Sequence, residues 1–333
     1  MRLENLLALT QASLLNEPCI NSFENIVFEA AKVKRGDIFF AYAYEDIPTA
    51  VLNGAYGIVF DKRRHVDISD NEIAWIKVAD LDNALKKLLR FKMIEKEVNA
   101  YECNEVVLKL SLQVSTQDNF VALQGDLISS FKHLWNIQER AVVLFCPALN
   151  DGNIFASVKK IPSPSFSTVS IVEQTLFETS FIYEDIFYER QLLSPFFIPY
   201  LEELLYFFKI LKISYKLKKF TPIEHFEAVF TNTKFEIKNF GTSDKVLIFE
   251  PNTSLIGSQI SFLQRNASWA DTIFIIPADH KQEDKDNIFG YKNDKDIIEI
   301  LKSNNFHFAL IAGMNKSILK KPLSNQTQLT MDF

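Results

Sequence analysis

Three continuous apolar runs in the last third of the chain constrain its fold more than any other feature. They cover residues 245–249, 272–276 and 306–311, and polar residues do not alternate within them. Such runs are typical of strands that are covered on both faces. Apolar residues at helical spacing lie between them, at 255–263 and 294–302. The order strand, helix, strand, helix, strand predicts right-handed crossovers and a parallel, Rossmann-like sheet.

The first 95 residues show a similar alternation in shorter segments. We expect a helix over Leu3–Leu15, a second over Ile47–Asn53 that ends at Gly54, and a third that starts after the N-cap residue Asp80. Four strands are predicted at residues 25–28, 38–42, 56–60 and 74–78. Together these segments predict a compact α/β unit.

The middle of the chain has weaker patterns. Glu105–Gln113 alternates in part and predicts a strand, and Val142–Cys146 predicts a short buried strand. Residues 150–190 favour strands and loops, and Pro199 opens a helix with one apolar face. The charged stretch Asp279–Asn293 is expected to be a loop.

Composition and spacing exclude several classes of protein. The net charge of −6 argues against direct nucleic-acid binding, which relies on clustered Lys and Arg. The three cysteines, at positions 19, 103 and 146, are never at C-x-x-C spacing, so neither a disulfide framework nor a zinc site is expected. The five histidines form no metal motif, and no metal site is predicted. The start of the chain lacks a signal peptide, and the most apolar stretch is too short to span a bilayer, so a cytoplasmic location is expected.

Three stretches near the N-terminus carry a family resemblance. Residues 31–41 read Ala-Lys-Val-Lys-Arg-Gly-Asp-Ile-Phe-Phe-Ala, residues 50–59 read Ala-Val-Leu-Asn-Gly-Ala-Tyr-Gly-Ile-Val, and residues 76–85 read Ile-Lys-Val-Ala-Asp-Leu-Asp-Asn-Ala-Leu. Over residues 25–92 the chain resembles the first domain of the Mur ligases, of the UDP-N-acetylmuramoyl-tripeptide–D-alanyl-D-alanine ligase kind. That family joins amino acids or dipeptides to UDP-muramoyl precursors of peptidoglycan.

The resemblance implies an α/β fold of three segments on the Mur ligase plan, with a Rossmann-like parallel sheet at the C-terminal end. The implied division is an N-terminal-like domain over residues 1–95, a shortened central domain over 96–218 and a Rossmann-like domain over 219–322. A polar tail covers residues 323–333. The third segment is similar to the family around Phe220-Thr221-Pro222 and at the strand that ends Phe249-Glu250-Pro251-Asn252.

The chain departs from the family where ATP would bind. Mur ligases carry T-G-x-x-G-K-T at the start of the central domain, where glycine backbone wraps the phosphates and the Lys neutralises them. We expect the corresponding stretch to be Leu108–Thr116, which has neither glycine nor G-K-[ST]. ATP and magnesium are therefore doubtful cofactors. The family's D-S-R becomes Glu29-Ala30-Ala31, and its G-R becomes His225-Phe226.

Four residues are candidates for ligand binding. Lys34 and Asp37 flank Gly36 in a turn, which could lie beside a ligand or be purely structural, and the structural interpretation is the simpler one. Glu250 and Asn252 follow a predicted parallel strand, where open α/β sheets bind ligands, although such residues also cap the next helix. No catalytic residue can be named. The loop residues Asp279, His280 and Asp284 are more typical of a solvated surface.

The chain ends Gln-Leu-Thr-Met-Asp-Phe, similar to the peptide with which bacterial replication and repair proteins dock on the sliding clamp. The partner-binding candidates are Gln328, Leu329, Met331 and Phe333. A Gln amide can meet polar partners while the apolar residues fill pockets, yet so short a pattern also arises by chance.

Three hypotheses follow. The first is a protein of peptidoglycan precursor metabolism that binds or regulates and does not ligate, with a UDP-muramoyl peptide as its partner. The second is an active ATP-dependent acid–amino-acid ligase with an atypical ATP site. The third is an interaction protein recruited by the sliding clamp. The sequence decides neither among them nor the oligomeric state.

Overall fold

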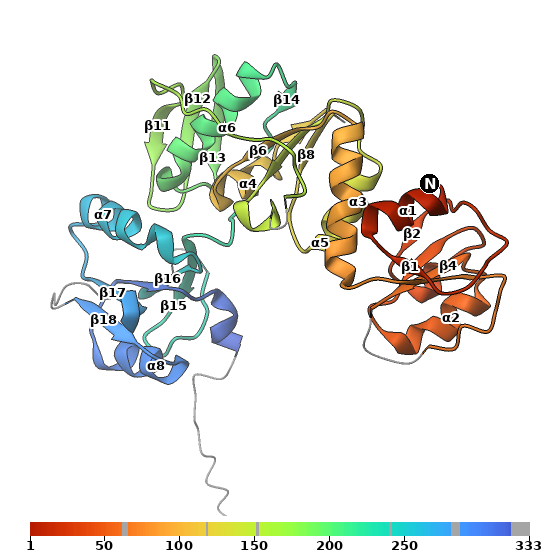
Figure 1. Ribbon diagram of the computed structural model, residues 1–333. Coiled ribbons are helices and arrows are strands. Elements are labelled where there is room, and N and C mark those ends of the chain that lie inside the picture. Colours follow the sequence, from red (N-terminus) through yellow and green to blue (C-terminus); the bar gives the residue numbers. More distant parts are fainter. Residues whose placement is uncertain (62–65, 118, 151–152, 240–241, 281–286, 321–333) are drawn as a thin grey trace, which may run out of the picture. The chain divides into compact units, whose positions relative to one another are not determined.

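The computed structural model of the 333-residue chain describes residues 1–61, 66–117, 119–150, 153–239, 242–280 and 287–320 (Figure 1). The chain forms two compact units. The first contains Met1–Leu112, Thr116–Pro162 and Leu211–Tyr215, and the second contains Gln113–Ser115, Ser163–Ile210 and Lys216–Phe333. The chain passes from one unit to the other after residues 112, 115, 162, 210 and 215, the second and the last of which lie in β7 (Ser115–Thr116) and β14 (Tyr215–Lys216). The domain boundaries expected at residues 95, 218 and 322 stay a prediction.

The first sheet of the first unit has the strand order β1-β5-β4-β3-β2. Its strands are β1 (Ser13–Leu14), β2 (Ile26–Val27), β3 (Ile38–Phe40), β4 (Gly57–Phe60) and β5 (Ala74–Lys77). All pairs are parallel except the edge pair β1–β5. Every residue of β3 and β4 is buried, because one face packs on α1 (Leu3–Thr10) and the other on α2 (Ile47–Leu52). The 3₁₀ turns η1 (Ala30–Lys32) and η2 (Tyr44–Asp46) precede β3 and α2.

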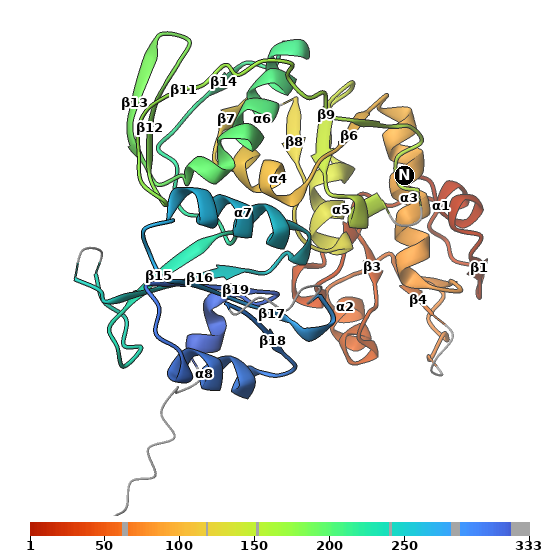
Figure 2. The same cartoon turned by 90° about the vertical axis from the view of Figure 1, so that its left-hand side faces the viewer.

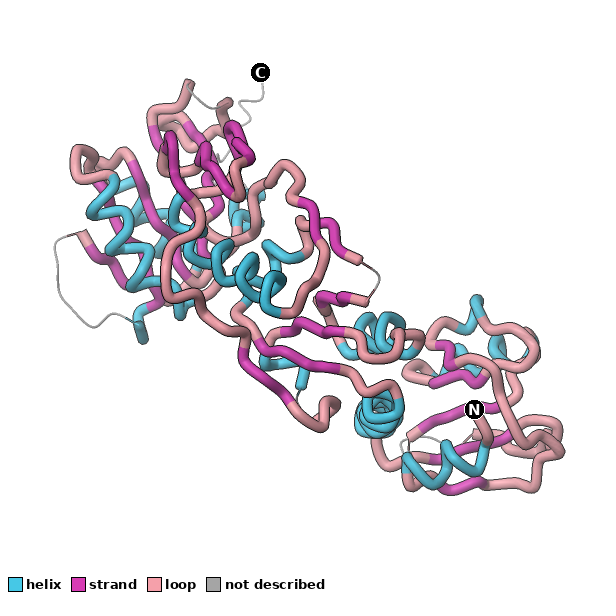
Figure 3. Tube along the Cα trace, turned by 90° about the horizontal axis from the view of Figure 1, so that it is seen from above, coloured by secondary structure: helices cyan, strands magenta, loops and turns pink. Residues whose placement is uncertain are grey.

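The helix α3 (Leu81–Glu95) connects this sheet to a second parallel sheet of the same unit. The second sheet has the order β10-β6-β9-β8. It consists of β6 (Asn99–Glu102), β8 (Phe120–Ala122), β9 (Val142–Phe145) and β10 (Val158–Lys160), with α4 (Glu105–Ser111), α5 (Leu127–Trp135) and η3 (Pro147–Asn150) between them. Figure 3 looks nearly along α3, which lies between the strands of the two sheets. Asp80 caps α3 as predicted, since its side chain accepts a hydrogen bond from the Asn83 N–H.

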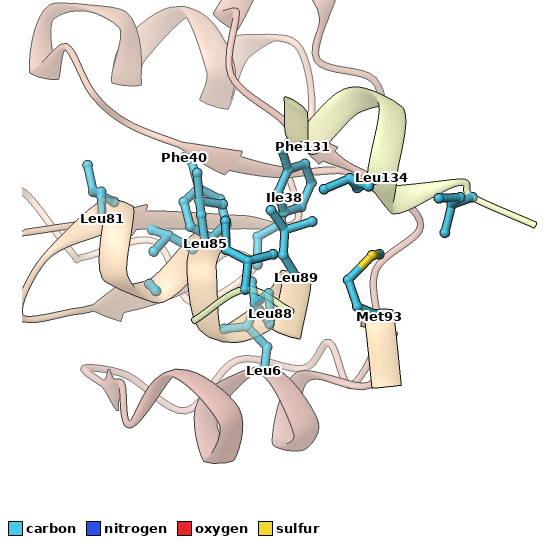
Figure 4. Close-up of a cluster of buried hydrophobic side chains, with 14 of the residues drawn as sticks. Leu6, Ile38, Phe40, Leu81, Leu85, Leu88, Leu89, Met93, Phe131 and Leu134 are labelled. Carbon is cyan, nitrogen blue, oxygen red and sulfur yellow. The ribbon is translucent and has the colours of Figure 1, made fainter. Parts of the chain in front are cut away.

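One hydrophobic core joins the two sheets of the first unit. The buried face of α3 contributes Leu85, Leu88 and Met93, which cluster with Phe40 of β3 and Phe131 of α5 (Figure 4). The apolar residues of α3 recur at helical spacing, so a single helix face reaches both sheets.

The second unit begins with an antiparallel meander. It comprises β11 (Ser170–Gln174), β12 (Thr179–Tyr183) and β13 (Ile186–Gln191), followed by η4 (Pro195–Phe197) and α6 (Ile198–Ile210). The helix predicted to open at Pro199 is confirmed, and its buried residues include Leu201, Leu204 and Phe208.

The last sheet has the order β15-β16-β19-β17-β18. Its strands are β15 (Glu227–Thr231), β16 (Lys245–Glu250), β17 (Thr272–Pro277), β18 (Ile288–Tyr291) and β19 (Phe308–Ala312). The helices α7 (Ile256–Asn266) and α8 (Asp294–Ser303) cover its two faces (Figure 2). Short 3₁₀ turns, η5 (Thr253–Leu255), η6 (Ala278–His280) and η7 (Lys316–Lys320), follow three of the strands. Four strands are parallel, which confirms the predicted Rossmann-like sheet, and β15 adds an antiparallel edge.

Three predicted elements need correction. Glu105–Gln113 is not a strand, because residues 105–111 form α4 after the cap residue Asn104. The stretch expected to be a charged loop contains β18. The first helix ends at Thr10, and Ser13–Leu14 pairs with β5 instead of extending the helix. Among the described helices, none combines the length and the apolar character that a bilayer crossing requires.

Candidate functional site

The connection from β6 to α4 lies at the carboxyl edge of a parallel sheet, where open α/β folds bind ligands. Only Cys103 and Asn104 separate the strand from the helix. The Asn104 side chain accepts a hydrogen bond from the Val107 N–H at 2.9 Å, and Glu105 places a carboxylate in the first turn. A phosphate cradle needs open backbone N–H groups and a nearby cation. This turn offers a cap residue and a negative charge instead.

The expected position of the phosphate loop is therefore wrong. Leu108–Thr116 begins inside α4 and ends in β7, so it does not follow the first strand of the sheet. A phosphate loop joins a strand to the next helix. In this sheet β6 leads to α4 through Cys103 and Asn104, and β8 leads to α5 through residues 123–126, and the first of these connections follows the first strand of the sheet in the chain. The error arises from the strand wrongly predicted at 105–113. The conclusion that glycine and G-K-[ST] are missing applies equally to the corrected position.

Glu250 lies at the end of β16 and is fully buried. One carboxylate oxygen is 2.7 Å from His225 Nδ1 and accepts the Asn252 N–H at 2.8 Å. The other accepts the Phe226 N–H at 3.1 Å and the Gln259 side-chain amide. Four hydrogen-bond partners saturate a carboxylate. Glu250 therefore ties the segment before β15 and the helix α7 to the end of β16.

The structure gives Glu250 and Asn252 structural partners. The Asn252 side chain accepts hydrogen bonds from the N–H and the hydroxyl of Ser254, so it caps the turn that leads into α7. The residues that complete the cluster, His225 and Gln259, were missed as candidates because each comes from a different element. A cavity of about 190 Å³ beside His225 and Phe226 is lined mainly by apolar side chains.

The turn at Lys34 and Asp37 also has a structural explanation. Asp37 is 3% exposed, and its two oxygens accept hydrogen bonds from the Asn25 amide and the Lys34 N–H, both at 2.9 Å. Gly36 has φ of +101°, which a side chain would strain. Lys34 is exposed beside this turn. The described contacts of Asp37 favour the structural interpretation, and ligand binding by either residue stays a prediction.

Polar groups that were not among the candidates from the sequence lie where β2 and β3 end. Glu29 forms ion pairs with Lys32 at 2.7 Å and Lys132 at 3.1 Å, and hydrogen bonds from these ammonium groups lower the pKa of Glu29. The Tyr42 hydroxyl donates to Asp82 at 2.5 Å, and burial together with this carboxylate raises the pKa of Tyr42. The available signal was position, since Glu29 and Tyr42 each come within two residues of a strand end.

A cavity of about 560 Å³ opens on the α2 side of the first sheet. Its apolar lining includes Tyr44, Val51 and Trp75, and its polar lining includes Asp67 and Asp70. The Trp75 indole is held in place, because its N–H donates to the Asp70 carbonyl at 2.9 Å. The volume falls within the range of about 300–1,000 Å³ that is usual for small-molecule pockets.

The candidates Gln328, Leu329, Met331 and Phe333 lie outside the described residues, as does Asp284. Clamp docking through this peptide stays a prediction. Deleting residues 328–333 and measuring binding to the sliding clamp tests it, and unchanged binding would end the idea.

Comparison with solved structures places this geometry among known folds. MurF from Acinetobacter baumannii superposes with a TM-score of 0.52 and 10% identity, over 93% of this chain and 94% of that one. The chain has a Mur ligase-like fold. MurF ligase from Thermotoga maritima in complex with ADP gives a TM-score of 0.49 and 12% identity, over 89% of this chain and 95% of that one. No protein-family model matches the sequence, and no curated protein matches it either.

The Mur ligase-like fold confirms the predicted fold class. At 10% identity the superposition with MurF shows that the helices and strands are arranged alike, and it shows nothing about site residues. The residues of a site must therefore be argued from this chain.

Proposed function

We propose that this protein binds a UDP-muramoyl peptide precursor of peptidoglycan, and that it acts as a binding or regulatory protein and not as a ligase. The Mur ligase-like fold and the resemblance of residues 25–92 to the family's first domain support the choice of ligand class. The short turn between β6 and α4 supports the absence of ligation.

The β6–α4 turn carries the second half of the proposal. A connection of two residues is too short for its backbone to surround a triphosphate. The Val107 N–H already donates a hydrogen bond to the Asn104 side chain. The Glu105 carboxylate would repel phosphate, whereas phosphoryl transfer depends on cations that neutralise the developing charge. The nearest cation on α4 is Lys109, more than one turn further along the helix.

The first half of the proposal rests on the cavity at Tyr44 and Trp75. It has the volume of a small-molecule pocket and aromatic walls. The carboxylates of Asp67 and Asp70 would repel a diphosphate, so we assign this cavity to a neutral or cationic part of the ligand. The Trp75 indole gives the cavity its own fluorescent reporter.

An assay of ATP turnover tests the absence of ligation. The purified full chain would be incubated with MgATP, a UDP-muramoyl tripeptide and D-alanyl-D-alanine, while an authentic ligase of this family is run alongside as a positive control. We expect no phosphate release above the level without enzyme. Magnesium-dependent release that requires the muramoyl substrate would refute this half and establish the alternative, a ligase with an atypical ATP site.

A fluorescence titration tests ligand binding. We expect UDP-muramoyl peptide to change the tryptophan emission with saturation, and Val51→Lys to weaken the affinity at least about tenfold by filling the cavity, a loss of about 1.4 kcal/mol. Ile94→Lys is the matched control, because Ile94 is 54% exposed on α3 and does not line the cavity. Equal affinities in both variants would place the ligand elsewhere. No binding by the unmodified chain would refute the ligand class.

A further inference from the structure

Cys103 and Cys146 follow the neighbouring parallel strands β6 and β9. The register pairs Glu102 with Phe145, the residues just before each cysteine. The Cys103 N–H donates to the Phe145 carbonyl at 3.0 Å, so the hydrogen-bond ladder continues to the cysteines. Neighbouring strands are about 4.7–4.9 Å apart, and disulfides span Cα distances of about 4.4–6.8 Å. Residues at equivalent positions also point to the same face of the sheet.

The two thiols differ in access and in reactivity. Cys103 is 5% exposed and its thiol donates to the Phe145 carbonyl at 3.7 Å, whereas Cys146 is half-buried. The neighbouring Cys103 thiol lowers the pKa of Cys146, against burial and the carboxylates of Glu105 and Glu102, which raise it, and the Lys109 ammonium also lowers it. The thiolate is the nucleophile in thiol chemistry, so the greater access and the lowered pKa of Cys146 favour it as the attacking group.

We propose that Cys103 and Cys146 form a redox-active dithiol, which small-molecule disulfides such as oxidised glutathione convert to an intrachain disulfide. The Cys146 thiolate attacks one sulfur of the oxidant, its S–S bond breaks and one thiolate leaves. The Cys103 thiol then loses its proton and attacks Cys146 Sγ, which displaces the second thiolate. Two protein thiols are oxidised, and one molecule of oxidant is reduced to two thiols.

This dithiol lies beside the β6–α4 turn, which supports the proposed absence of ligation. The dithiol proposal does not depend on that function. Cys103 immediately precedes Asn104, the cap of α4, and Cys146 immediately follows β9. A disulfide would therefore join the start of the β6–α4 turn to the end of the neighbouring strand. The two cysteines are far apart in the sequence, so their proximity follows only from the register of β6 and β9.

Thiol counting and mass spectrometry test the proposal on the folded, full-length chain. Cys19→Ser serves as the background throughout, because Cys19 is exposed and would react on its own. With excess oxidised glutathione, we expect both remaining thiols to disappear, the monomer to lose two hydrogen masses, and digestion to give a linked Cys103–Cys146 peptide. This measurement changes no residue of the core.

Single variants test the order of attack. Cys103→Ser should trap a stable glutathione adduct at Cys146. In the folded Cys146→Ser variant, Cys103 should react with oxidised glutathione at least about tenfold more slowly than Cys146 does in Cys103→Ser. Circular dichroism checks that each variant is folded, and Cys103→Ala is a second variant if serine is not tolerated. Two thiols that persist at saturating oxidant would overturn the proposal. So would disulfides found only between chains, or equal reactivity of the two cysteines.

Discussion

At the scale of single residues, Glu250 is a fully buried carboxyl group that has a hydrogen-bond partner on every side. Its carboxylate accepts hydrogen bonds from two backbone N–H groups and the Gln259 amide, beside His225 Nδ1. Glu250→Gln keeps the volume but turns one acceptor into a donor, which leaves buried N–H groups without an acceptor. We expect a loss of about 1–3 kcal/mol in the free energy of unfolding, measured by urea denaturation.

The matched control is Glu299→Gln, because Glu299 is an exposed glutamate on α8 in the same unit. It should change the free energy of unfolding by less than about 0.5 kcal/mol. If Glu250→Gln were as stable as the control, the cluster would not hold β16, α7 and the segment before β15 together. Its residues would then be free for a functional interpretation.

At the scale of elements, Gly313 directly follows β19 and lies close to the last residues of β17 and β18. It has φ of +77°, and an added Cβ would come within 2.8 Å of the Tyr291 hydroxyl and 2.9 Å of a Pro277 ring carbon. Gly313→Ala should lower the free energy of unfolding by about 1–3 kcal/mol, from backbone strain and the forced shift of β18. Thermal unfolding followed by circular dichroism measures the loss.

Gly257 is the matched control on α7, where an added Cβ meets nothing within 4 Å. Gly257→Ala should raise the stability by up to about 1 kcal/mol, because alanine loses less backbone entropy in a helix. Equal effects of the two substitutions would mean that the close approach to Tyr291 and Pro277 does not constrain this strand end.

Elements with a strong local pattern could be predicted from the sequence. The continuous apolar runs of β16, β17 and β19 and the cap at Asp80 lead directly to the observed strands and helix. The middle could not be predicted in the same way. β6 has only two buried residues, Ala100 and Tyr101, and α4 carries adjacent valines that favour a strand, although its Asn104 cap was visible.

The residues of the candidate site could likewise be predicted only where a local sequence pattern was strong. Glu250 and Asn252 were located because they follow a strong strand, but their partners depend on contacts between elements. His225 lies before β15, which was not predicted, and Gln259 lies on α7. The pair of Cys103 and Cys146 likewise depends on the register of two strands. Contacts of this kind follow from tertiary packing, which a local pattern does not encode.

At the scale of the whole molecule, each compact unit has its own hydrophobic core. Leu88 of α3 belongs to the core of the first unit, and Glu250 lies in the second. Because the two cores share no residue, we expect the units to open separately. Leu88→Ala should cost about 2–5 kcal/mol and speed amide hydrogen exchange only in the residues of the first unit. Glu250→Gln should speed it only in the second unit. Exchange that rises across the whole chain in either variant would show that the protein unfolds as one cooperative body.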